Sequence, residues 1–280
     1  IYLHGKPVVI TSTRQALKLG IGYLPRNRKE NGIIKDMNIL ENGSIVTLPR
    51  LTKFGLIRKA AQLKEKEELN MIFAAAPSQN ETLAALLARE EIPWERINAF
   101  HMDEYIGLSE DAPQRFGNFL KEAIFGRVNF KSVNYINGGA ADIEAECARY
   151  TGLLQEHPVD IVCLGIGENG HIAFNDPGVA DFQDQALIKV ACLDEVCRNQ
   201  QVNDGCFDSI DKVPTHAFTL TCPTLMAAKR KFCVVPAPTK AQAVYNTING
   251  DITEACPASI LRDSEGSTLY LDNDSSKLLN

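Results

Sequence analysis

Short apolar runs alternate with longer amphipathic segments over most of the chain. Runs typical of buried strands lie at residues 71–75, 97–101, 159–164, 217–221, 232–235 and 268–271. Helical periodicity covers residues 79–89, 143–157 and 241–248. This alternation predicts an α/β fold with a mostly parallel sheet and helices on both faces. No internal repeat is visible in the pattern.

The composition is that of an ordinary globular protein. The chain has 280 residues, 45% of them hydrophobic, and a formal charge of -6. Lys and Arg are spread along the chain, so no broad basic surface is expected and nucleic acid is not an expected partner. No apolar run approaches the roughly 20 residues of a membrane span, and the N-terminus lacks a signal-peptide pattern. The expected location is the cytoplasm, without a membrane partner.

The eight cysteines contain no CxxC pair. Most of them lie in apolar segments, and without a secretion signal we expect buried thiols rather than disulfides. Zinc-ligand spacing is absent, so no metal site is predicted. Cys163, just before a glycine-rich loop, is the one candidate nucleophile, although a small core residue is the favoured interpretation.

Two loops carry the residues best suited to chemistry. Residues 165–177 read GIGENGHIAFNDP and follow an apolar run, so glycines and His171 come after a buried strand. Residues 97–108 end in an acidic segment that contains Asp103. Ligands of open α/β sheets bind at the carboxyl ends of the strands, so we expect both loops to border one site. Taken alone, His171 could equally be a loop hydrogen-bonding residue, and Asp103 a carboxylate that caps a turn.

Two predicted helix starts could bind an anion. Residues 78–81 read SQNE, which has the spacing of a helix-capping box. A strand, a turn and a helix N-terminus also make an anion site from unpaired N–H groups, although Pro77 removes one donor. Lys240 stands at the start of a second helix after a strand. The alternative is that Lys240, like most Lys and Arg residues, is a surface charge.

An ordered series of motifs resembles the glucosamine-6-phosphate deaminase family. The series covers roughly residues 59–280 and consists of AAAPSQ at 74–79, FHMDEYIGL at 100–108, the glycine loop at 165–177, VPAPTKA at 235–241 and PASIL at 257–261. The resemblance implies a three-layer, modified Rossmann-like domain. It also implies an enzyme of the hydrolase/isomerase kind that acts on an amino-sugar 6-phosphate and uses no cofactor or metal. The resemblance leaves open whether the chain forms a homo-oligomer.

The resemblance also assigns roles to individual residues. Asp103 would move the proton between adjacent sugar carbons, because a positioned carboxylate can take it from one carbon and return it to the next. His171 would open the ring, because an imidazole can accept and donate a proton near neutral pH. The implied partners of His171 stand at Asn169 and Asp176. Asn169 cannot carry charge, so Asp176 is the expected acidic partner, with Glu168 as the alternative. The implied phosphate ligands are Ser78, Gln79, Arg198 and Lys240.

The first 56 residues do not fit this pattern. The segments GKPVV at 5–9, ALKLGIGYL at 16–24, RKENG at 28–32 and MNILEN at 37–42 are similar to an internal part of the ATP-binding subunits of sugar ABC transporters. The chain has neither a GxxxxGK(S/T) loop nor a signature of the LSGGQ kind, so ATP hydrolysis is not expected. We therefore predict an ABC-ATPase-like fragment at 1–56 and a deaminase-like catalytic domain at 57–280. At the start of this domain, Leu56, Ala60, Leu63 and Leu69 could mark one face of a helix.

The favoured function is conversion of glucosamine 6-phosphate to fructose 6-phosphate and ammonia. Galactosamine 6-phosphate differs at one hydroxyl, and no residue identified from the sequence selects between the two sugars. A sugar-phosphate lactonase on the same fold is an alternative, but lactone hydrolysis needs no proton transfer between carbons. A non-catalytic sugar-phosphate-binding protein is the alternative from another class.

Overall fold

A computed structural model describes residues 68–193, 195–203 and 205–279, together with four two-residue strands nearer the N-terminus. Backbone contacts divide the chain into Ile1–Glu67 and Glu68–Asn280. In the first part, β1 (Tyr2–Leu3) pairs antiparallel with β2 (Lys6–Pro7), and β3 (Thr52–Lys53) with β4 (Leu56–Ile57). Leu56 lies in β4, and Leu69 lies in a strand of the second part, so neither belongs to the predicted helix. Most of the segments similar to the ABC transporter subunits lie outside the described residues.

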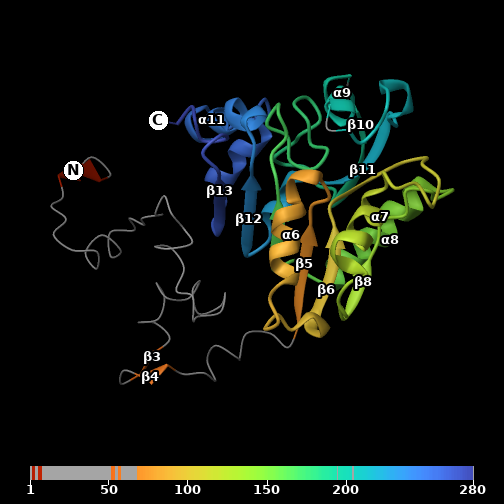
Figure 1. The fold of residues 1–280 in the computed structure, drawn as a ribbon, viewed down its shortest axis with the longest axis horizontal. Helices are drawn as coiled ribbons and strands as arrows, with labels where there is room; N and C mark the ends of the chain where they lie inside the picture. Colours follow the sequence, from red (N-terminus) through yellow and green to blue (C-terminus); the bar gives the residue numbers. More distant parts are fainter. Residues whose placement is uncertain are drawn as a thin grey trace. The chain divides into compact units, whose positions relative to one another are not determined.

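A six-stranded parallel sheet forms the centre of the second part (Figure 1). The strands, in the order β13-β12-β9-β5-β6-β8, are Ser267–Leu271, Arg230–Val235, Ile161–Leu164, Leu69–Phe73, Ile97–His101 and Ser132–Asn134. Every pairing between them is parallel. The predicted α/β class with a mostly parallel sheet is confirmed. The strand β8 was not predicted, because its three residues are too short for a recognisable apolar run.

Helices cover both faces of this sheet. The longer helices are α6 (Asn80–Leu87), α8 (Ile143–Glu156) and α11 (Ala241–Asn249), with short helices α7 (Phe116–Leu120) and α10 (Cys222–Met226) and a π-helical turn, η3 (Lys121–Phe125). Short 3-10 turns are η1 (Pro77–Gln79), η2 (Trp94–Arg96), η4 (Ile210–Lys212), η5 (Pro238–Lys240) and η6 (Pro257–Arg262). At the start of α8, the Asp142 side chain accepts a hydrogen bond from the Ala145 N–H at 2.9 Å, which satisfies one free donor of the helix end.

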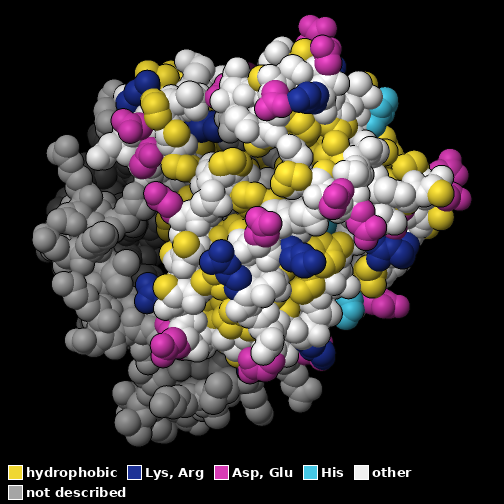
Figure 2. Space-filling model, turned by 45° about the vertical axis from the view of Figure 1, so that its right-hand side comes forward, with side chains coloured by type: hydrophobic (Ala, Val, Ile, Leu, Met, Phe, Trp, Pro, Cys, Tyr) yellow, Lys and Arg dark blue, Asp and Glu magenta, His cyan; other side chains and the backbone are white. Residues whose placement is uncertain are grey.

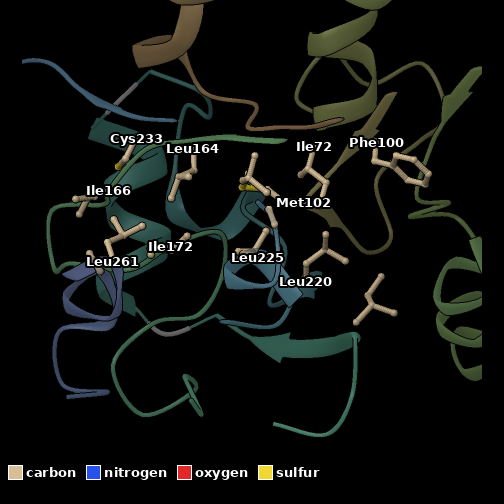
Figure 3. Close-up of a cluster of buried hydrophobic side chains, with 14 of the residues drawn as sticks. Ile72, Phe100, Met102, Leu164, Ile166, Ile172, Leu220, Leu225, Cys233 and Leu261 are labelled. Carbon is tan, nitrogen blue, oxygen red and sulfur yellow. The ribbon is translucent and has the colours of Figure 1, made fainter. Parts of the chain in front are cut away.

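The two faces of the sheet belong to different apolar clusters. Ile72 and Phe100 pack with α8 and α11 in one cluster, whereas Phe73 and Ala99 pack with α6 and α7 in the other. Successive strand residues point to opposite faces, so nearly continuous apolar runs supply both layers. Figure 3 shows the first cluster, in which side chains from several strands meet those of the loop after β9 and of η6.

A second, antiparallel sheet lies beside the first. It has the order β10 (Ile188–Cys192), β11 (His216–Leu220) and β7 (Asp103–Tyr105). The strand predicted at 217–221 forms one residue earlier, but it belongs to this antiparallel sheet. A third apolar cluster, which includes Tyr105, Phe174 and Cys197 of α9 (Glu195–Asn203), packs against it. This second sheet holds the acidic segment that follows β6.

Charged residues are distributed without a single dominant patch on the face shown in Figure 2, where Lys and Arg alternate with Asp and Glu over the described residues. None of the helices in the part of the chain that the structure describes is long and apolar enough to span a membrane. All eight cysteines are free thiols. Cys163 is a core residue, and burial raises its pKa to about 12, which opposes a nucleophilic role.

Candidate active site

Loops that follow four neighbouring strands of the parallel sheet border one cavity of about 290 Å³. The strands are β12, β9, β5 and β6, and the loops leave them at their carboxyl ends. The cavity is lined by residues 74–79, Met102, Asp103, Phe116, residues 165–167, His171, Ala173, Phe174, Gln200, Gln201, Pro236, Ala237, Thr239 and Lys240. The structure thus brings together five of the eight predicted site residues: Ser78, Gln79, Asp103, His171 and Lys240.

Asp103 stands where the chain passes from one sheet to the other. Residues 97–101 belong to the parallel sheet, and after Met102 the chain enters β7 of the antiparallel sheet, where Asp103 pairs with Thr219. The Met102 carbonyl accepts the Leu220 N–H at 2.8 Å, which holds this turn. Burial, and secondarily the nearby Glu104, raise the pKa of Asp103 well above its usual range. Its Oδ1 atom is buried and has no hydrogen-bond partner among the described residues.

Glu104 supports this segment from the side away from the cavity. Its carboxylate accepts hydrogen bonds from the backbone N–H groups of Tyr105, Phe116 and Gly117 at 2.9–3.0 Å. Burial raises the pKa of Glu104, while those N–H groups and Arg115 oppose the rise. Phe116 lines the cavity and Glu104 does not. Glu104 therefore fixes the start of α7 against β7.

The glycine-rich loop after β9 presents His171. The Gly167 N–H donates to the His171 carbonyl at 2.9 Å, and the imidazole lies directly against Gly167. A Cβ atom at Gly167 would fall 2.2–2.4 Å from ring atoms of His171, so only glycine leaves room for the ring. Gly170 has a φ of +87°, and the Ala258 N–H of η6 donates to its carbonyl at 2.8 Å. The loop is thus closed on itself and braced by η6.

The side chains of His171, Asp176 and Asn169 form a connected group. His171 Nδ1 lies 2.9 Å from Asp176 Oδ1, and Asn169 Nδ2 donates to the same oxygen at 2.8 Å. Asn169 Oδ1 accepts the backbone N–H of His171 at 3.0 Å. Burial would raise the pKa of Asp176, but the contacts with His171, Asn169 and the Cys197 thiol outweigh it and hold that pKa below its usual value. An ionised Asp176 can therefore orient the imidazole, while Asn169 fixes the carboxylate without adding charge.

The loops after β5 and β12 have the same local construction. Ala76-Pro77-Ser78 and Ala237-Pro238-Thr239 each lead through a 3-10 turn into a helix, α6 or α11. The predicted capping box is wrong, because neither η1 nor α6 has a side-chain cap and Ser78 lies inside η1. Two helix starts with uncapped N–H groups therefore lie at one cavity, which suits an anion. The repeated Ala-Pro-Ser/Thr signal could have identified Thr239, which the sequence analysis missed.

Gln79 connects the two loops. It is buried, and its amide nitrogen donates to the Val234 carbonyl of β12 at 3.1 Å. A Cβ atom at Gly165 would fall 2.9 Å from that nitrogen, so the glycine allows the close approach. Ala237 has a φ of +84° and a ψ of 149°, a conformation that is almost restricted to glycine. Backbone strain of this kind clusters at ligand sites, and Ala237 lines the cavity beside Lys240.

Arg198 is not brought to the cavity lining. Its guanidinium donates to the backbone carbonyls of Ile210 and Val213 at 2.6–3.3 Å, so it holds η4 instead. Gln200 and Gln201 of the same helix do line the cavity. The sequence carried no signal for them, because α9 is polar and its orientation follows only from packing against the second sheet.

The fold places the chain among α/β enzymes whose sites lie at the carboxyl ends of a parallel sheet. Within that class, the chain belongs to the glucosamine-6-phosphate isomerase/6-phosphogluconolactonase family, whose model matches residues 56–270. The relatives include a glucosamine-6-phosphate deaminase of Listeria innocua, 38% identical over 79% of this chain and 94% of its own length. A glucosamine-6-phosphate deaminase of Bacillus cytotoxicus is 33% identical over 80% of this chain and 83% of its own.

Two solved structures show how widely the fold is shared. A monomeric glucosamine-6-phosphate deaminase is 30% identical, covers 86% of this chain and 98% of its own, and superimposes with a TM-score of 0.71. A 6-phosphogluconolactonase of Thermotoga maritima is 20% identical, covers 76% and 88%, and has a TM-score of 0.60. The second likeness shows the fold alone. The names of the relatives at 30% identity or more support a deaminase and isomerase, and none of these names contains the broader term hydrolase. The resemblance of residues 1–56 stays a prediction.

Proposed function

We propose that the protein converts an amino-sugar 6-phosphate, with glucosamine 6-phosphate preferred, to fructose 6-phosphate and ammonia. The observation that carries the proposal is Asp103, a buried carboxylate at the cavity with one oxygen unpaired among the described residues. Such a group is suited to moving a proton between adjacent carbons. The relatives at 33–38% identity are named for the same deaminase, which supports the choice over the lactonase alternative.

The phosphate is held between the two helix starts. Lys240 and the hydroxyls of Ser78 and Thr239 line this part of the cavity with the N–H groups of η1 and η5. Gln79 keeps the two loops together, because its amide is hydrogen-bonded to β12. Arg198, whose guanidinium is bound to backbone carbonyls, takes no part in this arrangement.

The chemistry starts with ring opening at His171. The imidazole, oriented by Asp176, moves a proton between the ring oxygen and the C1 hydroxyl, which gives the open-chain aldehyde. Asp103 then takes the proton from C2 to form an enolamine and returns it to C1. The resulting imine at C2 adds water and releases ammonia, which leaves the ketone of fructose 6-phosphate. The raised pKa of Asp103 makes it a stronger base than an exposed carboxylate.

The test is an assay of the purified chain for both ammonia and fructose 6-phosphate. We expect equal amounts of the two products from glucosamine 6-phosphate, and turnover lowered by about a hundredfold or more in Asp103→Asn. The matched control is Asp111→Asn, an exposed aspartate outside the cavity, which should leave turnover unchanged. Binding of the sugar without ammonia release would support the non-catalytic alternative. Hydrolysis of 6-phosphogluconolactone in the absence of ammonia release would support the lactonase.

A further inference from the structure

The helix α9 borders the cavity through two neighbouring glutamines with different environments. Gln200 and Gln201 are each 9% exposed and both line the cavity. Gln200 Oε1 accepts the backbone N–H of Glu168 at 3.3 Å, so this residue attaches α9 to the loop that carries His171. Gln200 is therefore already committed to a structural contact.

Gln201 has no such commitment. Its backbone carbonyl accepts the Cys206 N–H at 2.9 Å, but its side-chain amide makes no hydrogen bond to any residue that the structure describes. The residue is mostly buried, and the cavity is where its side-chain amide can find a hydrogen-bond partner. Because Gln201 lines the cavity, a bound ligand is the group that can supply the missing partner.

We propose that the Gln201 carboxamide hydrogen-bonds a hydroxyl of the bound sugar. This inference rests on the proposed function, which places an amino-sugar phosphate in the cavity. A carboxamide both donates and accepts hydrogen bonds, as a hydroxyl does, whereas the phosphate is served by Lys240 and the two helix starts. The contact of Gln200 with Glu168 attaches α9 to the loop that carries His171, so Gln201 reaches the cavity from a helix that borders this loop. Gln201 is thus a substrate-recognition residue that the motif pattern does not reveal.

The experiment compares Gln201→Leu and Gln201→Ala with the wild-type chain. For each protein, kcat/KM is measured on glucosamine 6-phosphate and galactosamine 6-phosphate, together with inhibition by inorganic phosphate. We expect kcat/KM to fall about tenfold or more in both variants, because a hydrogen bond to a mostly buried amide is lost, while the inhibition constant for phosphate changes less than about twofold. A changed ratio between the two sugars assigns the contact to the C4 hydroxyl, and an equal fall assigns it to a hydroxyl that they share.

Gln242→Leu on the exposed face of α11 is the matched control and should leave all of these constants unchanged. The inference is overturned if kcat/KM stays within about twofold of wild type. It is also overturned if phosphate inhibition weakens in parallel with kcat/KM, since Gln201 would then contact the phosphate. Failure of the proposed function has a different signature, because the wild-type chain would then release no ammonia from either sugar. The Ala variant covers the case in which a leucine cannot pack at this position.

Discussion

Mild acid is expected to destabilise the fold through His101, a buried histidine behind the cavity. The Ile136 N–H donates to its Nε2 at 2.8 Å, and its Nδ1 lies 2.9 Å from the Asp103 carbonyl. Nε2 is therefore the acceptor and Nδ1 carries the proton. A second proton on Nε2 would oppose the Ile136 N–H inside the core. Burial, aided by the charge of Arg115, lowers the pKa of His101 from 6.5 to about 4.

The sign of the effect follows from this lowered pKa. Between pH 6.5 and about 4 the unfolded chain binds a proton at His101 and the folded chain does not, so the free energy of unfolding falls as the pH falls. At about 1.4 kcal/mol per pH unit, His101 alone removes about 3 kcal/mol across that window. The raised pKa values of Asp103 and Glu104 make the free energy of unfolding rise as the pH falls. Both residues are present in the wild type and in a His101 variant, so their contribution cancels when the two proteins are compared.

The comparison is between the wild-type chain and His101→Gln, whose amide does not titrate. Urea unfolding at several pH values between 7 and 4 is followed by the fluorescence of Trp94, the single tryptophan, which packs on Phe130 with ring centroids 5.1 Å apart. We expect the wild type to lose about 3 kcal/mol more than the variant over this range. The exposed His216→Gln serves as the control and should keep the wild-type dependence. Equal losses in the wild type and His101→Gln would refute the argument.

Three further predictions concern the cavity. Lys240→Ala should raise KM for the amino-sugar 6-phosphate about tenfold or more, while any activity on the unphosphorylated sugar stays unchanged. Steady-state kinetics would measure both, with Lys229→Ala, at an exposed lysine, as the control. Asp176→Asn should lower kcat about a hundredfold with little change in KM, because the imidazole of His171 loses its ionised partner. An unchanged kcat in steady-state kinetics would show that Asp176 takes no part in the mechanism. Ala237→Gly should raise the free energy of unfolding by about 1 kcal/mol, since glycine relieves the backbone strain at a φ of +84°. A urea concentration at half-unfolding below that of the wild type would show that Ala237 is not strained.

Much of the parallel sheet could be predicted from the sequence alone. A strand such as β9 is buried along most of its length and consists of apolar residues only, so local pattern detects it. The glycine loop could also be recognised from the sequence, because Gly167 leaves room for the ring of the nearby His171 and Gly170 adopts a positive φ. Strands β7 and β10 were missed because their stability comes from pairing with β11, which is distant in the chain. A pairing of that kind leaves little trace in short segments.

The candidate site divides in the same way. The residue types and the order of Asp103, His171 and Lys240 were evident from their motifs, because each follows a buried strand whose carboxyl end had to reach one edge of the sheet. Only the tertiary structure decided that Arg198 turns to the carbonyls of η4 and that Gln201 faces the cavity in its place. Both residues lie on α9, and the direction of a polar surface helix depends on what it packs against, which here is a sheet formed by residues far along the chain.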